Sequence, residues 1–113
     1  MSNKMQSASK EFRGVLAIPL VLRWTAGAPA IVQNLLNEEI ALTDNGTGDV
    51  TLTFASASVA PLILAGAVGL GVNQVELQAA ASTTVLRLLT GQDDGSATDP
   101  TDLHLYILKV IQN

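Results

Sequence analysis

The chain has few side chains that could act in catalysis, and it contains a single histidine, His104. A histidine that acts as a general base needs a partner that holds it in position. His104 instead lies between Leu103 and Leu105 in an alternating apolar stretch, which favours a structural or interface role. Cysteine is absent and no G-x-S-x-G motif occurs, so the sequence offers no activated nucleophile. We therefore expect a protein that is not an enzyme and has no metal or organic cofactor.

Segment 91–102 is polar and acidic, and its carboxylates could supply oxygen ligands for calcium. The four aspartates are Asp93, Asp94, Asp99 and Asp102. Their spacing does not match the EF-hand loop, and Asp-Gly and Asp-Pro pairs are also ordinary turn sequences. We expect a turn-rich loop here, with calcium binding as the open alternative.

Two further motifs are better explained by turns than by binding. Gly66, Gly69 and Gly71 form a G-x-x-G-x-G pattern, which does not match the dinucleotide fingerprint, and no helix is expected after it. Asn45-Gly46-Thr47 matches a glycosylation acceptor sequence. Asn-Gly is also the preferred pair of a tight hairpin turn, which accounts for it.

The segments that carry these residues are predicted to be strands. Residues 49–54 alternate strictly between polar and apolar side chains, which is typical of a strand with one buried face. Residues 40–43 form a second strand before it. Residues 44–48 between them are the predicted turn, in which Asn45-Gly46 supplies two residues that tolerate positive φ, as a type I′ turn requires. We predict a β-hairpin over residues 40–54.

Further apolar segments predict more strands, over residues 15–24, 59–68, 74–79, 83–89 and 103–111. Residues 31–36 are compatible with helical turns, but strands surround this short segment and favour an extended form. Pro19 cannot donate to a strand ladder and indicates an edge strand or a bulge. About seven or eight short strands between turns predict an all-β fold, an antiparallel β-sandwich of jelly-roll type. Residues 1–11 are expected to be a flexible N-terminal arm, and residues 12–113 the sandwich domain.

Segments 83–89 and 103–111 carry apolar side chains on both faces. One face packs in the core, and a symmetric copy of the chain would cover the other. The residues predicted at this oligomer interface are Leu86, Leu88, Tyr106, Leu108 and Val110.

Composition also indicates association. Apolar residues make up 48% of the chain and charged residues only 14%, against an average near 25% charged. Part of the surface is therefore expected to meet other copies or another protein. The net charge of −4 and six scattered basic residues argue against nucleic acid. Residues 50–75 are uncharged, but Pro61, several glycines and the alternation argue against a membrane span, and the N-terminus has no apolar targeting segment.

Three segments together resemble small jelly-roll domains of tailed-bacteriophage virions. They are TDNGTGDVTLTF (43–54), STTVLRLLTG (82–91) and GSATDPTDLHLYILKV (95–110), and the resemblance covers roughly residues 40–111. The shared features are a Gly-Thr-Gly turn, an alternating strand that ends in Phe, a Thr-rich strand, and a closing strand after an Asp-containing loop. Members of this family form trimers and occur as head-decoration proteins, tail fibres and receptor-binding tips.

The resemblance implies a structural virion protein. Because the chain has no fibre shaft, we expect a capsid decoration, or cement, protein that binds the major capsid protein as a homotrimer. It would lie on the capsid surface of the virion after synthesis in the host cytoplasm. The arm is expected to contact the shell or a neighbouring trimer through Met5, Lys10 and Phe12.

Two alternatives stay open. One is a tail or tail-fibre component that binds tail proteins or a host surface glycan during adsorption. The other is a carbohydrate-binding module, which would present Trp24 or Tyr106 as an exposed aromatic platform.

Overall fold

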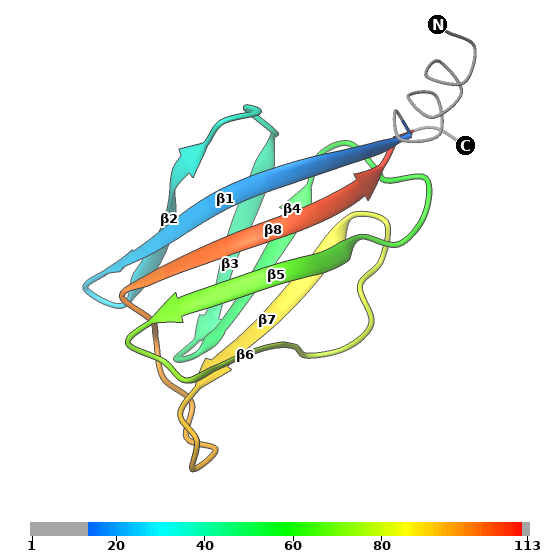
Figure 1. Cartoon of the computed structure of the whole chain (residues 1–113). Helices are drawn as coiled ribbons and strands as arrows, with labels where there is room; N and C mark the ends of the chain where they lie inside the picture. Colours follow the sequence, from blue (N-terminus) through cyan, green and yellow to red (C-terminus); the bar gives the residue numbers. More distant parts are fainter. Residues whose placement is uncertain (1–13, 112–113) are drawn as a thin grey trace, which may run out of the picture.

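The computed structural model describes residues 14–111, and the structural statements below concern this range. It contains eight strands and no helix (Figure 1). The strands are β1 (Val15–Thr25), β2 (Ala28–Asn34), β3 (Ile40–Gly46), β4 (Asp49–Phe54), β5 (Ile63–Leu70), β6 (Gln74–Leu77), β7 (Val85–Gly91) and β8 (Asp102–Val110). None of these residues belongs to a helix of the length and apolarity that a membrane crossing requires. The predicted all-β fold is confirmed.

The strands form two antiparallel four-stranded sheets that pack face to face as a β-sandwich. One sheet has the order β2-β1-β8-β5 and the other the order β3-β4-β7-β6. Figure 1 shows β1 and β8 side by side in the front sheet, with β2 and β5 at its edges. The segment between β7 and β8 extends past the end of both sheets.

The core forms because each strand turns its apolar positions inward, toward the opposite sheet. In β4 the buried residues are Val50, Leu52 and Phe54, as the alternation predicts. Each fully buried side chain of this size contributes about 1.5–3 kcal/mol relative to an exposed one. The core cluster consists of Ile18, Leu20, Leu22, Val50, Leu52, Phe54, Leu62, Leu86, Leu88, Leu103, Leu105 and Ile107.

The first and last strands are neighbours in the centre of one sheet. β1 pairs with β8 from Val15 opposite Val110 to Arg23 opposite Asp102. Beyond the pairing, the Ile111 N–H donates a hydrogen bond to the Gly14 carbonyl oxygen at 2.7 Å. The two ends of the described chain therefore lie together at one end of the sandwich.

The predicted hairpin over residues 40–54 is confirmed, but its turn is shorter than the predicted 44–48 and occupies only the end of that range. A bulge between Asp44 and Gly46 shifts the register, so the loop consists of Thr47 and Gly48. The positive φ values fall on Gly46 at 121° and Gly48 at 69°. Asn45 uses its side-chain amide to donate to Asp49 Oδ1 at 3.2 Å and to Thr51 Oγ1 at 2.7 Å.

Three other strand predictions need correction or refinement. Pro19 lies in the central strand β1. The prediction that Pro19 marks an edge strand is therefore wrong for β1 as a whole. However, β2 pairs with β1 only from Leu20 onward, and the β2 side of β1 is open at Pro19. This is where a residue without an N–H is tolerated. The strand predicted over 59–68 begins only after Pro61, at Ile63. Residues 31–34 are extended and belong to β2, as expected.

Candidate interaction surface

The structure places the five predicted interface residues in two different environments. Tyr106, Leu108 and Val110 point outward from β8 and lie on one surface. Leu86 and Leu88 of β7 are fully buried between the sheets. No other copy can reach their side chains in this fold, so the interface role predicted for these two leucines is wrong. Met5, Lys10 and Phe12 lie outside the described residues.

The outward face of the sheet β2-β1-β8-β5 is the candidate interaction surface, and we call it the β1/β8 face. Strand register brings its residues together, because Pro19 lies opposite Tyr106 and Ile63 opposite Leu108. Val68 is 62% exposed, Ile63 50% and Tyr106 47%. The β1/β8 face consists of Val15, Ala17, Pro19, Val21, Arg23, Ile63, Val68, Leu70, Asp102, His104, Tyr106, Leu108 and Val110.

The two charged side chains of the β1/β8 face neutralise each other. Arg23 Nε donates to Asp102 Oδ1 at 2.9 Å, and Arg23 Nη2 donates to Asp102 Oδ2 at 3.1 Å. These hydrogen bonds lower the pKa of Asp102 and raise the pKa of Arg23. The face is therefore largely apolar and has no net charge when His104 is neutral.

The outward face of the other sheet is mostly polar. It presents Thr43 of β3, Thr51 of β4 and Glu76 of β6. Across β4 and β7, Arg87 donates to both carboxylate oxygens of Asp49, at 2.9 and 2.7 Å. Hydrogen bonding from Arg87 lowers the pKa of Asp49. Of the two outward sheet faces, the β1/β8 face is thus the one suited to burial.

A groove of about 360 Å³ lies in the β1/β8 face beside Tyr106. It follows from the sequence of β5, because Gly66 lies opposite Tyr106 and has no side chain to fill the space. The groove combines apolar walls with the polar groups of His104 and Gln33. Its lining residues are Pro19, Leu20, Val21, Gln33, Leu35, Gly66, Ala67, Val68, His104, Leu105 and Tyr106.

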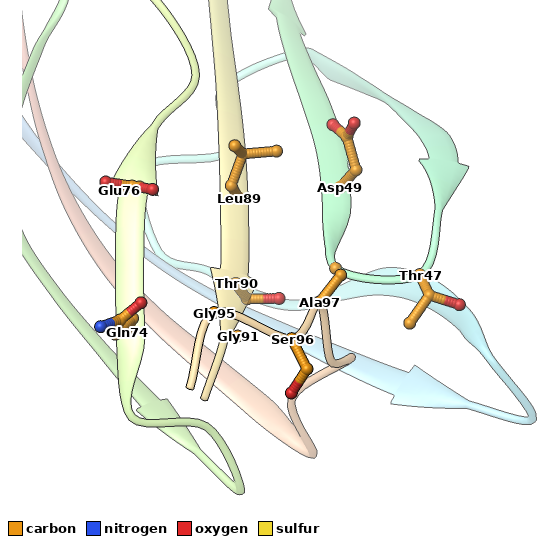
Figure 2. Close-up of a pocket in the computed structure, with 11 residues that line it drawn as sticks. Thr47, Asp49, Gln74, Glu76, Leu89, Thr90, Gly91, Gly95, Ser96 and Ala97 are labelled. Atoms are coloured by element: carbon orange, nitrogen blue, oxygen red, sulfur yellow. The ribbon is translucent and has the colours of Figure 1, made fainter. Parts of the chain in front are cut away.

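A second hollow, of about 200 Å³, lies where the β3–β4 turn meets segment 91–98 (Figure 2). Figure 2 shows Asp49, Leu89 and Glu76 on the neighbouring strands β4, β7 and β6 along one side of it. The Gly48 N–H donates to Asp99 Oδ1 at 2.7 Å, and this bond ties the turn to the loop. Asp49 is already paired with Arg87, and Ser96, which also lines the hollow, donates its hydroxyl to Asp94 Oδ1 at 2.7 Å.

The aspartates of segment 91–102 do not converge on one point. Asp94 accepts hydrogen bonds from the Ser96 backbone and hydroxyl, which lower the pKa of Asp94. Asp99 accepts the Gly48 N–H, and Asp102 pairs with Arg23. Within residues 14–111, no three His, Cys, Asp or Glu side chains are grouped so that they could hold a metal ion. These three aspartates thus serve as turn and strand contacts.

Lys109 is a buried charged residue that sequence reasoning missed. It lies on the inner face of β8 and is only 4% exposed. Its Nζ donates to Glu38 Oε1 at 2.9 Å and to the Ser56 hydroxyl, and it lies 6.0 Å from the centre of the Phe54 ring. The alternation along β8 could have located Lys109 in the interior, because it continues the inward series Leu103, Leu105 and Ile107.

No family model, curated protein or solved structure matches this chain. Function is therefore inferred from the sequence motifs and from the β1/β8 face.

Proposed function

We propose that the chain is a structural protein of a tailed-bacteriophage virion, which stabilises the capsid as a homotrimeric decoration protein. The observation that carries this proposal is the β1/β8 face, an apolar outward sheet face around Tyr106, Leu108 and Val110 with no net charge.

The β1/β8 face supports self-association. Monomeric proteins rarely expose large contiguous apolar patches, and such patches mark interaction sites. Each Å² of apolar surface removed from water contributes about 25 cal/mol. Copies related by rotational symmetry bury the same residues on every protomer, so the gain is repeated around the axis.

The motif resemblance supports a virion protein. Its three segments correspond to the β3–β4 hairpin, to β7, and to β8 with the loop before it. They meet through the β4–β7 pairing and through the hydrogen bond from Gly48 to Asp99. The three motif segments thus contact one another in the folded domain. Their order along the chain is the feature that resembles the phage domains.

A decoration protein acts by adding contacts across the capsid lattice. No bond is made or broken, and the stabilisation comes from buried area that is multiplied by symmetry and by simultaneous attachment of three linked subunits.

Carbohydrate binding is the second candidate, and the exposure of Tyr106 favours it. The ring lines a groove together with His104 and Gln33, which offer hydrogen-bonding groups beside an aromatic surface. Trp24, by contrast, packs against the core. Binding of the isolated domain to a glycan array, lost in Tyr106→Ala and retained in Thr43→Ala, would favour this candidate over decoration.

The experiment that tests the proposal is cryo-electron microscopy of the virion that carries this chain. The expected result is trimeric density on the capsid lattice into which the eight strands can be traced. Density at the tail would assign the protein to the adsorption apparatus. Absence of the chain from the particle would overturn the virion role.

A further inference from the structure

The pair Asn45-Gly46 is exposed at the end of β3, away from the β1/β8 face. Asn45 is the only asparagine of the chain that is followed by glycine. Glycine has no Cβ to hinder the approach of another group to its backbone nitrogen. The Asn45 amide is therefore the side-chain amide of this chain that the following backbone nitrogen can attack most easily.

The reaction open to such a pair is deamidation through a succinimide. The Gly46 nitrogen loses its proton and bonds to Asn45 Cγ, the Cγ–Nδ2 bond breaks, and ammonia leaves with that proton. Water then opens the ring at one of its two carbonyl carbons and gives aspartate or isoaspartate. In the structure the Gly46 N–H donates to Asp44 Oδ1 at 3.1 Å, so a carboxylate lies beside the proton that is removed.

The fold holds the Asn45 amide against β4. Its Nδ2 donates to Asp49 Oδ1 at 3.2 Å and to Thr51 Oγ1 at 2.7 Å. Asp49 is itself fixed, because Arg87 donates to both of its carboxylate oxygens. Ring closure requires the amide to leave these acceptors and turn toward its own backbone. The reaction therefore proceeds from the minor population in which the hairpin tip is open.

We propose that Asn45 is a site of spontaneous deamidation, and that its hydrogen bonds to β4 set the rate. The only co-reactant is water. This chemistry belongs to the β3–β4 hairpin and does not depend on the proposed virion role.

The products change the contacts of the hairpin. A carboxylate accepts hydrogen bonds but cannot donate them, so the bond from residue 45 to Asp49 is replaced by repulsion between two carboxylates. Isoaspartate also adds a carbon atom to the backbone of β3, next to the pairing of Gly46 with Asp49. Both products should therefore weaken the β3–β4 hairpin.

Peptide mass spectrometry of the full chain during incubation at mildly basic pH tests the proposal, because it follows each asparagine separately. The expected result is that Asn45 converts to aspartate and isoaspartate faster than Asn73, which is also exposed but is followed by glutamine. Asn45 should also convert more slowly in the folded chain than in the same chain unfolded by urea.

Two matched variants test the control by β4. Thr51→Val keeps the β-branched shape and removes the hydroxyl that accepts from Asn45. Its conversion should be about two- to tenfold faster than that of the natural chain, the range expected for the loss of one hydrogen bond. Thr53→Val makes the same change further along β4 and should convert at the natural rate. Circular dichroism establishes that both variants are folded.

The outcomes separate the site from its control. Conversion of Asn45 that is no faster than that of Asn73 overturns the modification site. Equal rates in the folded and the urea-unfolded chain overturn the control by β4, and this comparison needs no variant. Equal rates in Thr51→Val and Thr53→Val overturn that control as well and leave the modification site standing.

Discussion

At the scale of single residues, Lys109 shows how the sandwich accommodates a buried cation. Removal of an ammonium group from water is expensive unless the group is paired and hydrogen-bonded. Lys109 obtains both from Glu38 and Ser56, which belong to the segments that follow β2 and β4. One end of the fold is thus closed by a polar contact inside an otherwise apolar interior.

Loss of the Lys109 ammonium should therefore be costly. We expect Lys109→Ala to lower the free energy of unfolding by about 3 kcal/mol, because Glu38 keeps a largely buried carboxylate without its partner. The double variant Lys109→Met with Glu38→Gln should recover most of this loss, since no unpaired charge is then buried. Urea denaturation at one fixed protein concentration measures both. Equal stability of Lys109→Ala and the natural chain would contradict the account.

The exposed ion pairs predict the dependence of stability on pH. Hydrogen bonding to Arg87 and to Arg23 lowers the pKa of Asp49 and of Asp102 below the values of the unfolded chain. Their stabilisation is present above the unfolded pKa, near pH 4, and is lost as pH falls through the folded pKa.

Arg87→Gln should remove the contribution of its pair. We expect the variant to be slightly less stable than the natural chain above about pH 4, and the difference to vanish in stronger acid. Urea midpoints measured from neutral pH into strong acid check this. A difference that persists unchanged in strong acid would show that Arg87 acts through packing and not through its ion pair.

At the scale of elements, the β3–β4 turn depends on one glycine. Gly48 has a φ of 69°, and a Cβ there would lie 2.5 Å from the Thr90 carbonyl oxygen and 2.8 Å from the Thr98 nitrogen. Gly48→Ala should destabilise the fold by about 2 kcal/mol or more, since it combines a left-handed backbone with a backbone clash.

Gly95 provides a matched control for this turn. Its φ of 87° is similar, but no atom lies within 4 Å of the position that a Cβ would take. Gly95→Ala should therefore cost only about 1 kcal/mol, from the backbone conformation alone. Thermal unfolding of both variants at equal concentration gives the comparison. Equal losses in the two variants would mean that the close approach of Gly48 to the β7–β8 loop does not matter.

Most strands could be predicted from alternation because burial of one face enforces a period of two. The tip of the β3–β4 hairpin could not be placed within the predicted turn 44–48, since a bulge between Asp44 and Gly46 extends β3 and leaves only Thr47 and Gly48 in the loop. Pro19 was misleading for a similar reason. Sequence does not reveal that β2 stops short of Pro19 and leaves its side of a central strand open.

At the scale of the whole molecule, the candidate surface depends on which side chains of each strand point outward and which point into the core. β8 has apolar residues on both faces, and its outward residues Tyr106 and Leu108 were correctly separated from the inward series. In β7 the two apolar faces could not be ranked from sequence, and the pairing with β4 turns Leu86 and Leu88 inward. The groove beside Tyr106 could not be predicted from the sequence either, because it depends on the β5–β8 register, which places Gly66 opposite Tyr106.

The sandwich as a whole has two unlike sides. One outward face carries the ion pair of Arg87 and Asp49 among threonines, and the other carries the apolar residues of β1, β5 and β8. Such a difference between faces is typical of a subunit that buries one side in an assembly. We therefore expect the chain to self-associate through the β1/β8 face.

The most direct test of that claim is the mass of the full chain in solution, measured by sedimentation equilibrium for the natural chain, Tyr106→Glu and Thr43→Glu. Both variants add one carboxylate at an exposed strand position, on opposite outward faces. We predict three times the 11.8 kDa chain mass for the natural chain and for Thr43→Glu, and a folded monomer for Tyr106→Glu. A natural chain that sediments as a monomer, or a Tyr106→Glu variant that assembles as tightly as the natural chain, would contradict the account.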